Sequence, residues 1–132
     1  MIYKNIAAIG AGGAIGAIFR YLINLQLLST GLPTGTVIEN LTGSLMLGVA
    51  TGWMLNSNAR EWINKGIGVG FCGGFTTMST LASDTLALGS QLSLIASVIY
   101  LTVSLFGGIL LAFGGLILGT KWSEGHRKVR GS

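Results

Sequence analysis

The chain has 132 residues, of which half are hydrophobic and only 9% are charged. A soluble domain carries about 25% charged residues, so this chain has too few charges to cover its surface in water. The composition therefore excludes a soluble enzyme and predicts an all-α integral membrane protein whose apolar surface is covered by lipid.

Long stretches without charge divide the chain into membrane-spanning segments. A spanning helix needs roughly 20 apolar residues. We expect one transmembrane domain, residues 1–120, with helices near residues 3–25, 34–55, 65–83 and 92–119. Residues 121–132 are predicted to be a basic cytoplasmic tail, whose last residues could be left over from expression.

The first expected helix carries a pair of glycines four residues apart. Gly12 and Gly16, with Arg20 at the end of the helix, predict a flat face that packs closely against a partner helix. The segment is longer than the apolar part of a signal peptide, so we expect it to be retained. The glycines also imitate a dinucleotide-binding loop, but that loop needs a strand before it and a βαβ unit around it.

A polar motif marks the second expected helix. Asn40 lies in the segment 35–48, and its carboxamide offers two donors without net charge, which suits an anion that must be held weakly. The alternative is an interhelical hydrogen bond that only stabilises the bundle. Glu39 is expected at the membrane edge, in a solvated vestibule.

The third expected helix changes composition in its middle. Paired glycines at residues 73 and 74 precede a run of Thr and Ser, which makes a continuous helix unfavourable. We therefore expect a break near residues 73–77, which would free carbonyls for a cation or amides for an anion. Cys72 is expected to be a small apolar filler.

The fourth expected helix holds two polar residues one turn apart. Tyr100 and Ser104 could face the same path, or they could be ordinary packing residues.

Positive charge is distributed unevenly about the four expected spans. Only Arg20 falls on one side, and the other side carries Lys4, Arg60, Lys65, Lys121, Arg127, Lys128 and Arg130. This bias predicts that both termini lie in the cytoplasm, at the cell inner membrane. The basic tail is expected to lie against anionic lipid, and no nucleic-acid partner is expected.

The motifs together resemble the Fluc, or CrcB, family of fluoride channels over nearly the whole length. The matching pieces are residues 16–21, 35–48 and 70–80. The resemblance implies an antiparallel, dual-topology-type dimer of four-helix subunits that exports cytoplasmic fluoride passively and so prevents its toxicity. It also implies a structural sodium ion at the dimer interface, held by main-chain carbonyls of Gly73 and Thr76, since carbonyl oxygens suit that hard cation.

The same resemblance implies which residues meet the fluoride. Asn40 matches the pore asparagine, and Arg20 matches the arginine that ends the first helix. The implied fluoride pathway comprises Asn40, Met78, Ser79, Thr80, Leu81, Tyr100 and Ser104.

Two features depart from the family pattern. Family members usually carry two phenylalanines where this chain has Met78 and Leu81, so the positive ring edges are lost. The charge bias also disfavours insertion in both orientations, and both departures favour a heterodimer with a related subunit over a homodimer.

Three other functions stand beside that of a conducting subunit. A non-conducting partner subunit is one alternative. A small multidrug transporter is a weaker one, because it needs a carboxylate in the first span and this chain has none there. No enzyme is expected, since His126 is the only histidine and no pair of carboxylates shares a face.

Overall fold

The computed structural model describes residues 1–27, 31–57 and 59–130, with side chains through residue 125. All regular structure in these ranges is helical. The helices are α1 (Ile2–Leu27), α2 (Thr34–Leu55), α3 (Glu61–Lys65), η2 (Gly66–Cys72), α4 (Gly73–Phe75), α5 (Met78–Gln91) and α6 (Leu94–Arg130). The segments α3, η2, α4 and α5 follow one another along a single path, which we term the third crossing.

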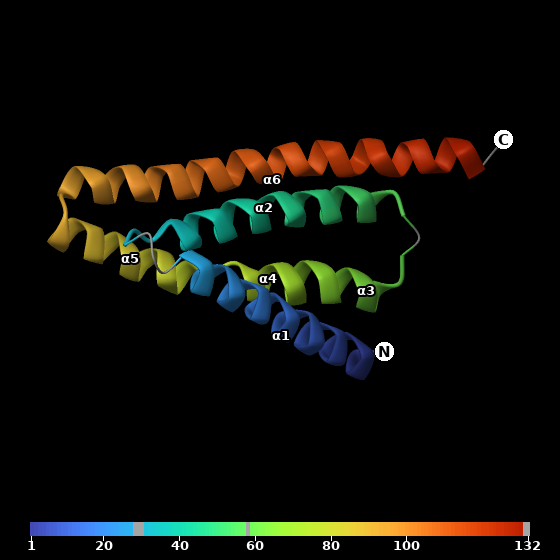
Figure 1. Ribbon diagram of the computed structural model, residues 1–132. Helices are drawn as coiled ribbons and strands as arrows, with labels where there is room; N and C mark the ends of the chain where they lie inside the picture. The colour runs from blue at the N-terminus through green and yellow to red at the C-terminus, as the bar shows by residue number, and fades with distance from the viewer. Residues whose placement is uncertain (28–30, 58, 131–132) are drawn as a thin grey trace.

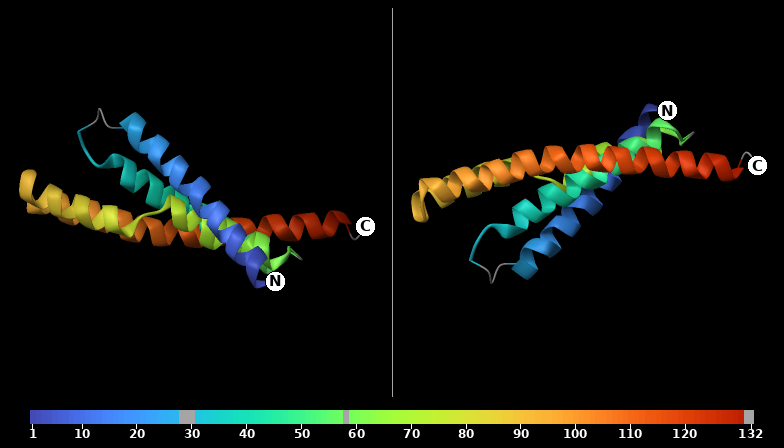
Figure 2. Two further views of the ribbon diagram at one scale, coloured as in Figure 1. Left: turned by 90° about the horizontal axis from the view of Figure 1, so that it is seen from below. Right: turned by 90° about the horizontal axis from the view of Figure 1, so that it is seen from above.

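The helices form two packed pairs that run side by side. In Figure 1, α6 lies along α2, and α1 lies across the first half of the third crossing. Figure 2 shows that α1 diverges from the direction of α6. Both termini and the connection between α2 and α3 lie at the same end of the molecule. The connection from α1 to α2 lies toward the opposite end. Gly31 in that connection has a φ of 67°, which favours glycine.

Glycines bring the backbones of each pair into contact. A Cβ atom on Gly48 or Gly52 of α2 would run into the main chain of α6, and one on Gly115 or Gly119 of α6 would run into that of α2. On α1, the Gly12–Gly16 face packs in the same way against η2 and α4. In a membrane, where hydrophobicity does not drive helix association, such close packing is a main source of stability.

Large apolar side chains cover the outside of the bundle. Phe106, Leu110 and Ile18 are each more than half exposed, and few apolar side chains are buried. Two helices of the described residues, α1 and the part of α6 from Leu94 to Gly125, are long and apolar enough to cross a membrane. The distribution is the one expected of a protein solvated by lipid.

The helix limits differ from the sequence prediction where polar residues continue a helix. Helix α2 has the expected limits, 34–55. Helix α1 starts slightly before and ends slightly after the expected range 3–25. The third crossing runs from Glu61 to Gln91 instead of 65–83. The last helix continues to Arg130, so the expected tail is helical up to that residue, and residues 131 and 132 lie outside the described part. Hydropathy marks the membrane-embedded part of a helix, whereas Lys, Glu and Arg extend a helix beyond it.

Candidate functional site at the interrupted third crossing

The third crossing is interrupted by two residues in extended conformation. Thr76 has ψ near 156°, and Thr77 has φ near −148° and ψ near 123°. Helix α5 then begins with Thr77 as its N-cap, whose hydroxyl accepts a hydrogen bond from the amide of Thr80 at 3.3 Å. In the described chain, no hydrogen bond joins the carbonyls of residues 73–75 to an amide of α5. The interruption therefore leaves main-chain oxygens without a helical partner.

The side chain of Asn40 on α2 braces this interruption. Its Nδ2 donates to the carbonyl of Thr77 at 2.9 Å, and its Oδ1 accepts from the amide of Thr77 at 2.7 Å. The interhelical hydrogen bond that the sequence left as an alternative is thus present. A carboxamide nitrogen carries two hydrogens, so one donor of Asn40 is left over after the bond to Thr77.

An open groove of about 390 Å³ runs beside the interruption, between α2, the third crossing and α6. Six residues expected from the sequence line it: Asn40, Gly73, Thr76, Met78, Leu81 and Ser104. The hydroxyl of Ser104 is the notable polar group among them, because this side chain is only 4% exposed and its Oγ has no hydrogen-bond partner. A buried hydroxyl without a partner costs free energy, so Ser104 is a candidate for contact with a ligand in the groove.

Met78 and Leu81, where the resemblance implies phenylalanines, occupy different environments. Met78 is 66% exposed, and Leu81 is only 2% exposed, although both line the groove. The nearby aromatic rings of Phe71 and Phe75 stack with centroids 5.9 Å apart, and neither ring lines the groove. The residues that line the groove therefore include no aromatic ring.

Tyr100 belongs to a second polar cluster, outside this groove. Its hydroxyl lies 3.0 Å from Oδ2 of Asp84, and Thr36 donates to the same oxygen at 2.7 Å. Thr80 and Asp84 line a separate cavity of about 180 Å³. Ser79 is exposed and meets only the hydroxyl of Thr77, at 3.3 Å. The structure thus separates Tyr100, Ser79 and Thr80 from the lining of the groove.

Glu39 corrects the sequence prediction of a solvated carboxylate. Its side chain is 0% exposed, because it faces α1, where Nδ2 of Asn24 donates to its Oε1 at 2.8 Å. Its other oxygen has no hydrogen-bond partner. The same Asn24 amide donates to the carbonyl of Arg20 at 3.1 Å, which links the half-buried arginine to this contact.

Sequence reasoning missed three residues of these polar clusters. Thr77 is the direct partner of Asn40, and Asp84 accepts hydrogen bonds from both Tyr100 and Thr36. Asp84 ends a charge-free stretch, and a carboxylate close to membrane depth is itself a signal for function. The pairing of Asn40 with Thr77 had no such signal, because the two residues are 37 positions apart.

Side chains offer little for a metal ion. The described residues contain no group of three or more His, Cys, Asp or Glu that could hold one. The main-chain oxygens at the interruption are donors of the type that hard cations prefer.

These features define an all-helical membrane protein with an open polar groove at an interrupted helix. A family model described as "CrcB-like protein, Camphor Resistance (CrcB)" matches residues 7–116. The chain therefore belongs to the CrcB family.

Curated relatives match over most of the chain. A protein of Halalkalibacterium halodurans named "Fluoride-specific ion channel FluC 2" is 52% identical over 130 residues, which cover 98% of this chain and 96% of the relative. A protein of the same name from Bacillus subtilis is 40% identical, with 89% of each chain covered. "Fluoride-specific ion channel FluC" of Methanopyrus kandleri is also 40% identical, covering 86% of this chain and 87% of its own. The family is one of ion channels, so the chain is not an enzyme.

Proposed function

We propose that this chain is a subunit of a fluoride channel through which cytoplasmic fluoride leaves the cell passively, so that fluoride does not reach toxic levels. The names of its relatives support fluoride as the ion. The observation that carries the proposal is the Ser104 hydroxyl, which is buried in the groove and has no partner in the subunit.

Neutral donors in the groove suit the transport of a small anion. Ser104 and the second Nδ2 hydrogen of Asn40 can each donate to fluoride without adding a positive charge. Binding by neutral donors is strong enough to replace some water around the ion and weak enough to release it. The aliphatic side chains of Met78 and Leu81 would narrow the path without binding the ion. Ser79, Thr80 and Tyr100 do not line the groove, so the proposed path gives them no direct contact with fluoride in this subunit.

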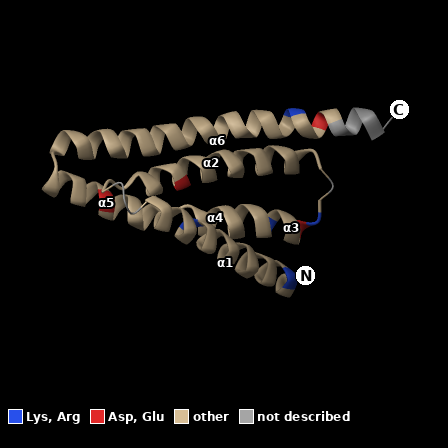
Figure 3. Cartoon of the chain, viewed as in Figure 1, with Lys and Arg blue, Asp and Glu red and all other residues tan. Residues whose placement is uncertain are grey.

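A second subunit is needed to complete the path. The groove is open along one side, and conduction of an ion through lipid needs walls on all sides. We propose an antiparallel dimer in the plasma membrane, with both termini of this subunit in the cytoplasm. The termini share one end of the molecule, and Figure 3 shows positive charge there at the start of α1 and around α3, whereas α1 carries one further positive charge toward its other end. This bias favours a heterodimer with a related subunit of opposite orientation.

The interruption also fits the proposed structural sodium ion. The carbonyl of Gly73 has no hydrogen bond to α5, and a Cβ on Gly73 would have no atom within 4 Å, so this face is open toward a partner. Carbonyl oxygens of Gly73 and Thr76 would hold the ion. A cation bound there would neutralise the partial charges of carbonyls that lack a helical partner.

Fluoride efflux from liposomes tests the proposal. Ser104→Ala should slow efflux several-fold, while the folded subunit stays at least as stable, because the hydroxyl makes no hydrogen bond there. Thr102→Ala, two residues away on the exposed face of α6, is the matched control and should conduct normally. Normal efflux in Ser104→Ala would remove Ser104 from the path.

A non-conducting partner subunit is the second candidate, and the aliphatic residues Met78 and Leu81 favour it. Liposomes that contain this chain alone, and then this chain with a related subunit, separate the two functions. Efflux from the chain alone would exclude an obligate partner. Efflux that is restored by the partner and unaffected by Ser104→Ala would support the non-conducting role.

A further inference from the structure

A second cavity lies away from the groove, where the first turn of α1 meets α3. Its volume is about 470 Å³, and it is lined by Met1, Lys4, Asn5, Arg60, Glu61 and Trp62. None of these residues lines the groove at the interruption.

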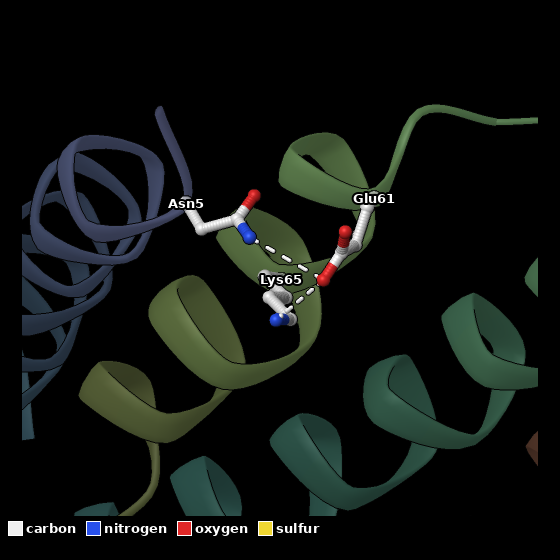
Figure 4. A network of polar contacts seen from close by, with 3 residues as sticks. All are labelled: Asn5, Glu61 and Lys65. Carbon is white, nitrogen blue, oxygen red and sulfur yellow. Dashed lines mark hydrogen bonds and ion pairs between the residues drawn. The ribbon is translucent and has the colours of Figure 1, made fainter. Parts of the chain in front are cut away.

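The one acidic residue of this cavity is already neutralised. Oε1 of Glu61 lies 2.6 Å from Nζ of Lys65 and accepts a hydrogen bond from Nδ2 of Asn5 at 3.3 Å. Figure 4 shows that Asn5 reaches from α1 toward this ion pair. The network fastens the start of α1 to α3 and holds the two walls of the cavity together.

The two basic residues of the cavity keep their charge uncompensated. Lys4 on α1 and Arg60 before α3 form no ion pair within the part of the chain that the structure describes. They come from two different walls of the cavity, so an anion in it has a basic residue on each wall. Trp62, which is 39% exposed, adds an aromatic ring with a polar N–H at the same place.

The position along α1 places this cavity at the level of the lipid headgroups. A helix of 26 residues is roughly 39 Å long at 1.5 Å per residue, whereas the hydrocarbon core is about 30 Å thick. The charged Lys4 and polar Asn5 in the first turn of α1 mark this end as the part that extends beyond the hydrocarbon. Trp and basic residues are typical of this interfacial layer, and basic pockets between spanning helices bind anionic headgroups.

We propose that the cavity between Lys4 and Arg60 binds the phosphate of an anionic phospholipid headgroup, with Trp62 against the glycerol and upper acyl region. The ammonium of Lys4 and the guanidinium of Arg60 would hold the phosphate oxygens from two sides. A bound lipid would then add to the attachment of α1 to α3. The site is independent of fluoride conduction.

Quenching of Trp62 fluorescence by brominated lipid tests this site in the full chain. Trp53→Phe and Trp122→Phe leave Trp62 as the sole tryptophan. Brominated phosphatidylglycerol in nanodiscs should quench Trp62 more than brominated phosphatidylcholine at the same mole fraction. The double variant Lys4→Gln, Arg60→Gln should lower the relative affinity for phosphatidylglycerol roughly tenfold.

Two controls decide between this cavity and other sources of the effect. Lys121→Gln removes an exposed charge outside the cavity and should keep the preference for phosphatidylglycerol. If Lys121→Gln lost this preference as fully as the double variant does, the cause would be the general surface potential, and the proposed site would be overturned. Millimolar inorganic phosphate should not abolish the preference, and its doing so would show a site for free phosphate instead. Equal quenching by the two lipids would also overturn the proposal.

Discussion

The two halves of the third crossing are attached to the rest of the molecule in different ways. Before the interruption, η2 and α4 lie backbone against backbone on α1, with glycines on both sides. After it, α5 packs on α6 through side chains, and Ser97 donates to the carbonyl of Thr85 at 2.7 Å. Gly70 and Gly74, which face α1 from the first half, leave no room for added atoms, whereas the second half is held by polar bonds that tolerate small changes. The interruption lets one crossing combine both kinds of packing.

The largest expected effect is a difference in stability between two variants, each of which adds one methyl group to one half of the third crossing. Gly74→Ala would drive a Cβ into the main chain at Gly13, so we expect a loss of about 2 kcal/mol or more in the free energy of unfolding. Gly89→Ala on α5 meets only the side chain of Ser97 at ordinary contact distance, so it should be close to neutral. Titration with sodium dodecyl sulfate, followed by circular dichroism, compares the two variants. Similar losses would show that the halves do not differ in this way.

A negative charge at the interruption, where the two halves meet, should stop fluoride efflux while most of the folded structure is retained. In Asn40→Asp, a carboxylate cannot donate to the carbonyl of Thr77, and its charge repels an anion in the groove. We expect fluoride efflux from liposomes to fall to background. Gln26→Glu, which adds the same charge at an exposed position of α1, is the control. Unchanged efflux in Asn40→Asp would remove Asn40 from the path.

A substitution at Gly73 is expected to have a smaller effect, on dimer assembly and not on the folding of the subunit. A Cβ on Gly73 meets nothing within 4 Å, so Gly73→Ala should fold as a subunit as well as the parent chain does. If this face meets the proposed sodium ion and partner, the variant should form fewer dimers and lose any stabilisation by sodium. Native mass spectrometry with sodium and with potassium measures both. A dimer with unchanged sodium dependence would place the ion elsewhere.

The smallest effect concerns the polar link between the first half and α1. The hydrogen bond and charge of Lys65 lower the pKa of Glu61 from its ordinary value of 4.5. Because the folded-state pKa lies below the unfolded one, the stabilisation is present above about pH 4.5 and is lost as the pH falls through the lowered pKa. Glu61→Gln should therefore flatten the acid decline of the thermal midpoint slightly. Glu124→Gln, on the exposed face of α6, should leave that decline unchanged.

The membrane class and the limits of α2 could be predicted because they depend on local composition. An apolar run that contains a single charged residue, Glu39, begins after Pro33 and ends with Leu55, and α2 has these limits. The ends of the third crossing and of α6 could not be found in this way, because helices that leave the hydrocarbon continue with charged residues. A hydropathy pattern does not detect the part of a helix that extends beyond the apolar segment.

The candidate site was only partly predictable. Asn40 and the lining residues of the third crossing stand out by type, since amides, glycines and hydroxyls are unusual in an apolar run. Tyr100 and Ser104 are one turn apart on α6, yet Tyr100 contacts Asp84 while Ser104 opens to the groove. Four residues advance a helix by about 400°, and the remaining 40° or so, with the length of the tyrosine, is enough to choose different neighbours.

Local patterns along the chain therefore determined the helical class, the membrane environment and the residues that suit an anion. Those properties follow from composition and from backbone hydrogen bonding, which act over a few residues. Tertiary structure alone decided that Asn40 meets Thr77, that Glu39 is buried beside Asn24, and that Ser104 is left without a partner. Each of these results depends on how helices distant in sequence approach one another, and the glycines that permit that approach do not by themselves specify which side chains will meet.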